Sequence, residues 1–98
     1  MDKLLLPLRI PAGWCVLYNE WNAISPDDVD SQNWLKEDLL QLKNSTLNLV
    51  ADVGWYGDKF LDGKFSVFLY NESFLGEKLA EYNSRNFIEV VKVLELWL

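Results

Sequence analysis

The stretch that decides the fold is LNLVADVGWYGDKFLDGKFSVFLYN, residues 47–71. Its first part places apolar side chains at every second position, from Leu47 to Val53, and residues 64–71 alternate in the same way. Such alternation is typical of β-strands, because successive side chains of a strand point to opposite faces. The glycine-bounded sequence GDKFLDG lies between the two runs, so the stretch predicts an antiparallel hairpin.

Two further segments read as strands. Residues 13–21, GWCVLYNEW, are rich in aromatic and β-branched residues and predict a strand buried on most of both faces. Cys15 lies within it, so we expect this single cysteine to be a buried structural residue rather than a nucleophile. One cysteine excludes an internal disulfide and fits a reducing compartment. Residues 78–82 predict a short strand.

Two segments have the spacing of helices. Residues 31–44, SQNWLKEDLLQLKN, start with a plausible N-cap and repeat apolar residues at helical intervals, at Trp34, Leu35, Leu39 and Leu42. A second helix follows a cap at Asn83 or Ser84, and its apolar stripe consists of Phe87, Ile88, Val91, Leu94 and Leu98.

The order of these elements predicts the fold class. Residues 1–98 are expected to form a single globular domain of the α+β type, near the usual size of an independently folding unit. We predict a mostly antiparallel sheet of about four to five strands with two helices packed on one face.

The charge of the chain limits its partners. Fifteen acidic residues against nine basic ones give a net charge of −6, which repels phosphate backbones and anionic lipids. We therefore expect no nucleic-acid partner. No apolar run approaches the roughly 20 residues that cross a bilayer, and the N-terminus lacks the pattern of a signal peptide. A cytoplasmic protein without a membrane partner is the expectation.

The residue types also limit the chemistry. The chain has no histidine, which removes the commonest acid–base residue and zinc ligand, and its one cysteine is too few for a structural zinc site. The spacing in the hairpin tip fits neither an EF-hand calcium loop nor a phosphate-binding loop. We expect no enzyme activity, metal or cofactor. A hydrolase using paired carboxylates stays open as an alternative, its candidates being Glu20, Asp52, Asp58, Asp62 and Glu81.

Aromatic residues next to acidic ones indicate a binding surface. Trp21 follows Glu20 at the end of a predicted strand, and Tyr56 precedes the acidic hairpin tip. Tryptophan and tyrosine are enriched in interface hot spots, and acidic charge speeds association with a basic partner. The predicted partner-binding residues are Glu20, Trp21, Tyr56, Asp58 and Asp62.

Four segments in this order, IPAGW…YNEW, WLKEDLLQL, ADVGWYGD…GKFSVFLY and YNSRNFIEVVKVLELWL, carry a family resemblance. The chain resembles small bacterial immunity proteins of contact-dependent growth inhibition and related polymorphic toxin systems. The resemblance covers nearly the whole chain and rests on the two Gly-Trp motifs, the Asp before the second, and the Ser-Arg-Asn before the last helix. It implies a non-enzymatic cytoplasmic protein that neutralises the C-terminal domain of a cognate toxin, frequently a basic nuclease, by covering its active site or an adjacent surface.

A different class of function is the runner-up. The chain could be a small-molecule-binding or regulatory α+β domain with a pocket between sheet and helix. A large apolar cavity there would favour a ligand, whereas a well-packed core with an exposed acidic face would favour a protein partner.

Overall fold

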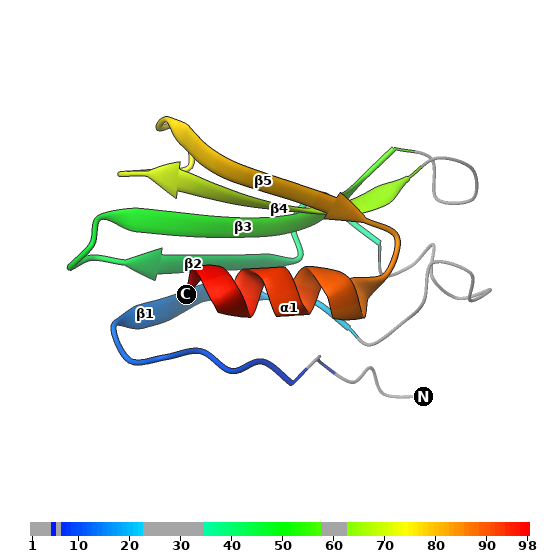
Figure 1. Cartoon of the computed structure of the whole chain (residues 1–98), viewed down its shortest axis with the longest axis horizontal. Helices are drawn as coiled ribbons and strands as arrows, with labels where there is room; N and C mark the ends of the chain where they lie inside the picture. The colour runs from blue at the N-terminus through cyan, green and yellow to red at the C-terminus, as the bar shows by residue number, and fades with distance from the viewer. Residues whose placement is uncertain (1–4, 6, 23–34, 58–62) are drawn as a thin grey trace.

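The computed structural model describes residues 5, 7–22, 35–57 and 63–98. Within them the strands are β1 (Trp14–Asn19), β2 (Leu40–Asn44), β3 (Leu49–Tyr56), β4 (Lys64–Asn71) and β5 (Lys78–Ser84), and the helix is α1 (Phe87–Trp97). The strands lie in the order β1-β2-β3-β4-β5, and every neighbouring pair is antiparallel. Figure 1 shows the strands side by side, with α1 lying across one face. The predicted α+β class and antiparallel sheet are confirmed.

The central hairpin is present as predicted. β3 and β4 pair along their whole length, with Leu49 opposite Asn71 and Tyr56 opposite Lys64. The tip between them, residues 58–62, lies outside the described residues. The predicted strand at residues 78–82 is also present as β5 and continues to Ser84.

The predicted helix at residues 31–44 is wrong over its second half. Residues 40–44 form β2, residues 35–39 belong to no regular element, and residues 31–34 lie outside the described part of the chain. Leu40 and Leu42 are fully buried and alternate with half-buried polar residues, which is the period of a strand. Leucine spacing alone fits a helix equally well. Backbone pairing with β1 on one side and β3 on the other decides for the strand, so among the described residues one helix, not two, packs on the sheet.

α1 begins two residues later than the sequence indicates. Its N-cap is Asn86, whose side-chain oxygen accepts a hydrogen bond of 2.9 Å from the backbone N–H of Ile88. The predicted caps, Asn83 and Ser84, are wrong because β5 still includes both residues. In the described part of the chain, no helix has the length and apolar character needed to cross a membrane.

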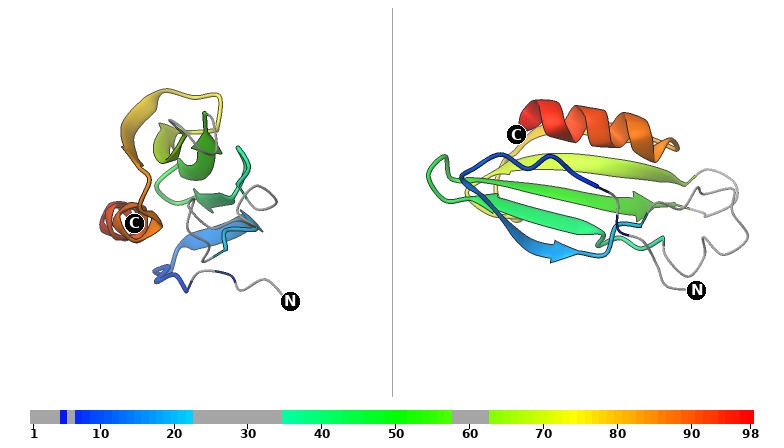
Figure 2. Two further views of the ribbon diagram at one scale, coloured as in Figure 1. Left: turned by 90° about the vertical axis from the view of Figure 1, so that its right-hand side faces the viewer. Right: turned by 90° about the horizontal axis from the view of Figure 1, so that it is seen from below.

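The core lies between α1 and one face of the sheet. Val90 and Leu94 are the fully buried residues of the helix, whereas Ile88, which belonged to the predicted stripe, is 53% exposed. The N-terminal segment, residues 7–11, lies on the same side of the sheet as α1 (Figure 2), and its Leu8 and Ile10 pack against the core. The buried residues facing them come from β1 to β4 and from the residues after β1, and include Trp14, Trp21, Leu40, Leu42, Val53, Trp55, Phe65 and Val67.

No described helix or strand covers the opposite side of the sheet, which we call the open face. Cys15 lies on this face opposite Lys43, and it is exposed rather than buried. The prediction of a strand buried on both faces is therefore wrong for β1. The reason is its position, because β1 is an edge strand with one sheet neighbour and no layer above its outer residues.

Gly54 allows one irregular segment to fold over the open face. The segment of residues 35–39 is fixed to β3 by two backbone hydrogen bonds, Leu39 N to Val53 O at 2.9 Å and Trp55 N to Lys36 O at 2.7 Å. A Cβ atom at position 54 would lie 1.9 Å from the carbonyl oxygen of Glu37. The close approach of this carbonyl therefore requires glycine.

Replacing Gly54 with alanine should destabilise the protein by about 2 kcal/mol or more, because the added methyl group forces the segment 35–39 away from β3. Urea unfolding of Gly54→Ala measures this loss. Lys64→Ala, an exposed change on the same hairpin, is the control and should lie within about 0.5 kcal/mol of the native protein. A Gly54→Ala protein as stable as the control would contradict the close approach.

Candidate functional site

A row of side chains crosses the middle of the open face. Tyr18, Gln41, Asp52, Phe68 and Glu81 stand opposite one another on the five successive strands. Directly opposed residues of a sheet are within contact distance, so this register assembles residues that are far apart in sequence. The row combines two aromatic rings with two carboxylates.

Further aromatic rings extend this row. The ring of Tyr56 packs edge-on against Phe68 at 5.7 Å between centroids, and Phe68 lies 5.9 Å from Tyr70. Tyr56 also leans over Gly54, where its Cε2 would be 3.1 Å from an added Cβ. Its hydroxyl group donates a long hydrogen bond of 3.4 Å to the carbonyl of Glu37. The three rings, all half-buried, form a continuous aromatic strip on β3 and β4.

The segment 35–39 adds negative charge beside this strip. Glu37 and Asp38 are both exposed there. Burial in the first place, together with the negative charges of Asp52 and Glu37, raises the pKa of Tyr56 to about 12. The pKa of Tyr18 is also raised, mainly because its hydroxyl group donates a hydrogen bond to Glu20. The phenol groups of this face therefore stay protonated at neutral pH.

Asp52 is the least favourably placed carboxylate of the face. Burial raises its pKa to about 6, the charge of Asp38 adds to the rise, and a hydrogen bond with Gln41 opposes it. Its Oδ1 atom is buried, and none of the described residues donates a hydrogen bond to it. A carboxylate in this position costs folding free energy at neutral pH, where it is mostly ionised.

Two lysines of the face are already paired. At the edge of the sheet, the ammonium nitrogen of Lys36 lies 3.2 Å from a carboxylate oxygen of Glu20. Lys78 lies 2.6 Å from Glu81, with its ammonium group 5.4 Å from the centre of the Phe68 ring. Among the described residues no ion pair joins a cation to Glu37, Asp38 or Asp52, so this part of the face keeps its negative charge.

The five predicted partner-binding residues have different positions. Glu20 and Tyr56 belong to the open face or its edge, as described above. Trp21 is 1% exposed and packs in the core, 6.0 Å from Phe65, so it is not a surface contact. Asp58 and Asp62 lie outside the described residues.

Sequence reasoning did not assign four residues of the face to a binding surface: Asp38, Asp52, Phe68 and Tyr70. The alternation of β3 and β4 is visible in the sequence, and it places Asp52, Phe68 and Tyr70 on the face opposite the core. These three residues could therefore have been assigned to an exposed face from the sequence. Asp38 had no such signal, because residues 35–39 were expected to be helical and their path over β3 depends on tertiary contacts.

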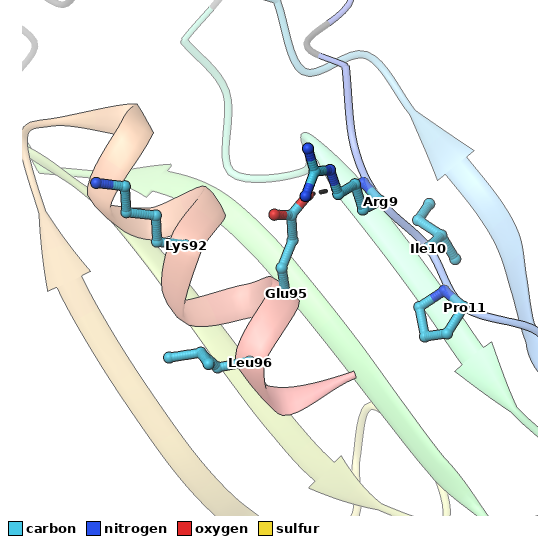
Figure 3. Close-up of a pocket in the computed structure, with 6 residues that line it drawn as sticks. All are labelled: Arg9, Ile10, Pro11, Lys92, Glu95 and Leu96. Carbon is cyan, nitrogen blue, oxygen red and sulfur yellow. Dashed lines mark hydrogen bonds between the residues drawn. The ribbon is translucent and has the colours of Figure 1, made fainter.

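A second feature lies on the opposite side of the molecule. A hollow of about 700 Å³ lies between the N-terminal segment and α1 and is lined by Arg9, Ile10, Pro11, Lys92, Glu95 and Leu96. Figure 3 shows Glu95 of α1 pointing towards Arg9. The backbone N–H of Arg9 donates a 2.7 Å hydrogen bond to Glu95, which joins the two sides. The hollow is an open groove on the outside of the helix, whereas the predicted ligand pocket was expected between helix and sheet, where Val90 and Leu94 are fully buried.

The open face is the better candidate, because its charges and rings are concentrated on one side of the sheet. The residues that the structure describes contain no group of three or more Cys, Asp or Glu side chains able to hold a metal ion.

Replacing Asp52 with asparagine should stabilise the free protein at neutral pH. The native carboxyl group takes up a proton near pH 6 when folded but only near pH 3.8 when unfolded, so the stability contributed by this group falls as the pH rises from 4 to 6. Asp52→Asn removes that fall. Allowing for partial solvent screening, we expect a gain of about 1 kcal/mol at pH 7.5 and little change at pH 3.5.

Urea unfolding at the two pH values measures the effect. Glu81→Gln is the contrasting variant, because Lys78 and Asn83 lower the pKa of Glu81, and this change should give no gain in stability at pH 7.5. Equal responses of the two variants would contradict the unfavourable position of Asp52.

No protein-family model matches the chain, and neither a curated protein nor a solved structure matches it. What the chain binds is therefore inferred from its own residues, above all from those of the open face.

Proposed function

We propose that this protein is an immunity protein that binds a basic, nuclease-type bacterial toxin domain and neutralises it as a stoichiometric inhibitor in the cytoplasm. The proposal is supported by one observation above the others. The open face combines half-exposed aromatic rings with carboxylates that have no cationic partner among the described residues.

Each part of this combination suits a protein partner. Aromatic rings bury a large area at a small cost in conformational entropy, which is why tyrosine is enriched in interface hot spots. Carboxylates at the surface speed the approach of a basic protein and reject an acidic one. The overall net charge of −6 acts in the same direction.

The position of Asp52 also supports a role in binding. A residue that lowers the stability of the free protein is best explained by a benefit outside folding. A cation placed near Asp52 would lower its raised pKa and recover part of the free energy that its burial costs. A basic partner would supply that cation.

The mechanism of inhibition would be occlusion. Nuclease active sites are surrounded by basic residues that contact phosphate groups, and an acidic surface that covers them keeps the nucleic acid out. Asp58 and Asp62, predicted from the sequence as further contacts, would add to the negative charge that meets the partner. No group in this mechanism needs to react, so the protein acts by affinity alone.

The test is co-expression with the toxin domain encoded by the neighbouring gene. We expect the native protein to restore growth and to form a one-to-one complex whose affinity falls with salt. Asp38→Lys, which reverses an unpaired charge on the open face, should weaken binding about 30-fold or more. Isothermal titration calorimetry at low and high salt measures both effects.

Glu77→Lys is the matched control, because it is exposed, changes the net charge equally and lies beyond the far end of β4. It should leave affinity within about threefold of the native value. Reversing both Asp58 and Asp62 tests the tip in the same assay. Full protection by every variant, or a neighbouring gene that encodes no toxin, would overturn the proposal.

A further inference from the structure

One lysine of the chain itself, Lys78, already places its ammonium group on the open face. The ammonium group of Lys78 lies over the ring of Phe68 and pairs with the carboxylate of Glu81 at 2.6 Å. The side-chain amide of Asn83 donates a hydrogen bond of 2.9 Å to the same carboxylate and fixes it. On this surface, therefore, one basic side chain lies over an aromatic ring and pairs with a neighbouring carboxylate.

The other end of the aromatic strip repeats this combination. Here the ring of Tyr56 and the backbone carbonyl of Glu37 meet above Gly54, and the side chains of Glu37 and Asp38 are exposed on the same segment. Glu37 also offers its backbone carbonyl, which accepts only a long hydrogen bond from Tyr56. The nearest lysine on this segment, Lys36, is held by Glu20. Lys64 stands opposite Tyr56 on β4, but among the described residues no cation lies over the Tyr56 ring or pairs with Glu37 or Asp38.

We infer that this end of the open face binds an arginine side chain of the basic partner, stacked on the ring of Tyr56 and paired with Asp38. The inference rests on the proposed function and names the contact that this function would use. Charge complementarity supports it, since the acidic end faces outward on a sheet surface that no described element covers.

The acceptors favour guanidinium over ammonium. They are the exposed carboxylates of Glu37 and Asp38 and the backbone carbonyl of Glu37, which lies 3.4 Å from the Tyr56 hydroxyl group. A guanidinium group is planar, stacks on aromatic rings and presents five donors in one plane, whereas an ammonium group is a compact and strongly hydrated charge. An arginine can therefore stack on Tyr56 and donate to several of these acceptors together.

Charge disfavours a second copy of the chain as the source of this arginine. The sequence contains two arginines, Arg9 and Arg85. Arg85 donates a 2.8 Å hydrogen bond to the carbonyl of Gly63 and lies over the ring of Trp55. Two copies also carry −6 each, so they repel. The arginine is expected on a partner of opposite charge.

The test uses the free protein and small probes, so it does not need the toxin. N-acetyl-arginine amide is titrated into ¹⁵N-labelled protein, and the amide signals of Gly54, Tyr56 and Phe68 are followed. We expect saturable shifts confined to this end of the face. The lysine analogue should bind at least about threefold more weakly, and the neutral citrulline analogue should not bind.

Matched variants locate the contact. Asp38→Asn and Tyr56→Leu should each weaken the arginine probe about threefold or more, whereas Tyr56→Phe, which keeps the ring, and Glu77→Gln, an acid elsewhere, should not. Thermal unfolding verifies that each variant is folded. Equal binding of the lysine or citrulline analogue, shifts spread over the whole protein, or indifference to Asp38→Asn and Tyr56→Leu would each overturn the inference.

The inference and the proposed function fail separately. If the toxin is neutralised but the arginine probe does not bind near Tyr56, the site inference is wrong and the function stands. If the probe binds as expected but the neighbouring gene encodes no toxin, the arginine site stands and the function is wrong.

Discussion

The structure depends on the packing of one short helix against one face of a five-stranded sheet. Val90 and Leu94 of α1 are fully buried, and the N-terminal segment completes the same layer with Leu8 and Ile10. No described helix or strand is left to cover the second face, so its own side chains and the segment 35–39 must exclude water. Val50 shows that they do, since it is 1% exposed although it lies opposite Lys43 on the open face. Aromatic strand residues, with their large areas, are well suited to this task.

Gly54 connects this architecture with the candidate site. Because position 54 has no side chain, the carbonyl of Glu37 and the ring of Tyr56 can occupy the same small area above β3. The first contact brings the acidic segment 35–39 onto the face, and the second turns the ring towards Phe68. A single residue without a Cβ therefore places acids and aromatics side by side, although they come from different parts of the chain.

The sequence predicted those parts of the fold that a short window determines. The hairpin of residues 47–71 was recognisable because the alternation of apolar residues predicts two strands and the glycines between them predict the turn. Residues 40–44 were assigned wrongly because leucine spacing fits helix and strand alike, and the pairing with β1 and β3 that decides between them is not local. The exposure of Cys15 and the burial of Trp21 depend likewise on strand order and on which face the helix covers. The candidate site was predicted least well, because its central row joins five strands by register.

The aromatic and acidic characters of the open face reinforce each other physically. Rings that exclude water lower the effective dielectric constant around the carboxylates, and a charge in such surroundings interacts more strongly with an incoming cation. The same exclusion raises the pKa of Asp52 to about 6, because the isolated carboxylate loses hydration that no described residue fully replaces. The cost to the free protein and the attraction for a cation therefore have one cause. A neutral residue at position 52 would remove that cost, whereas the carboxylate that is present keeps a charge that an incoming cation would stabilise.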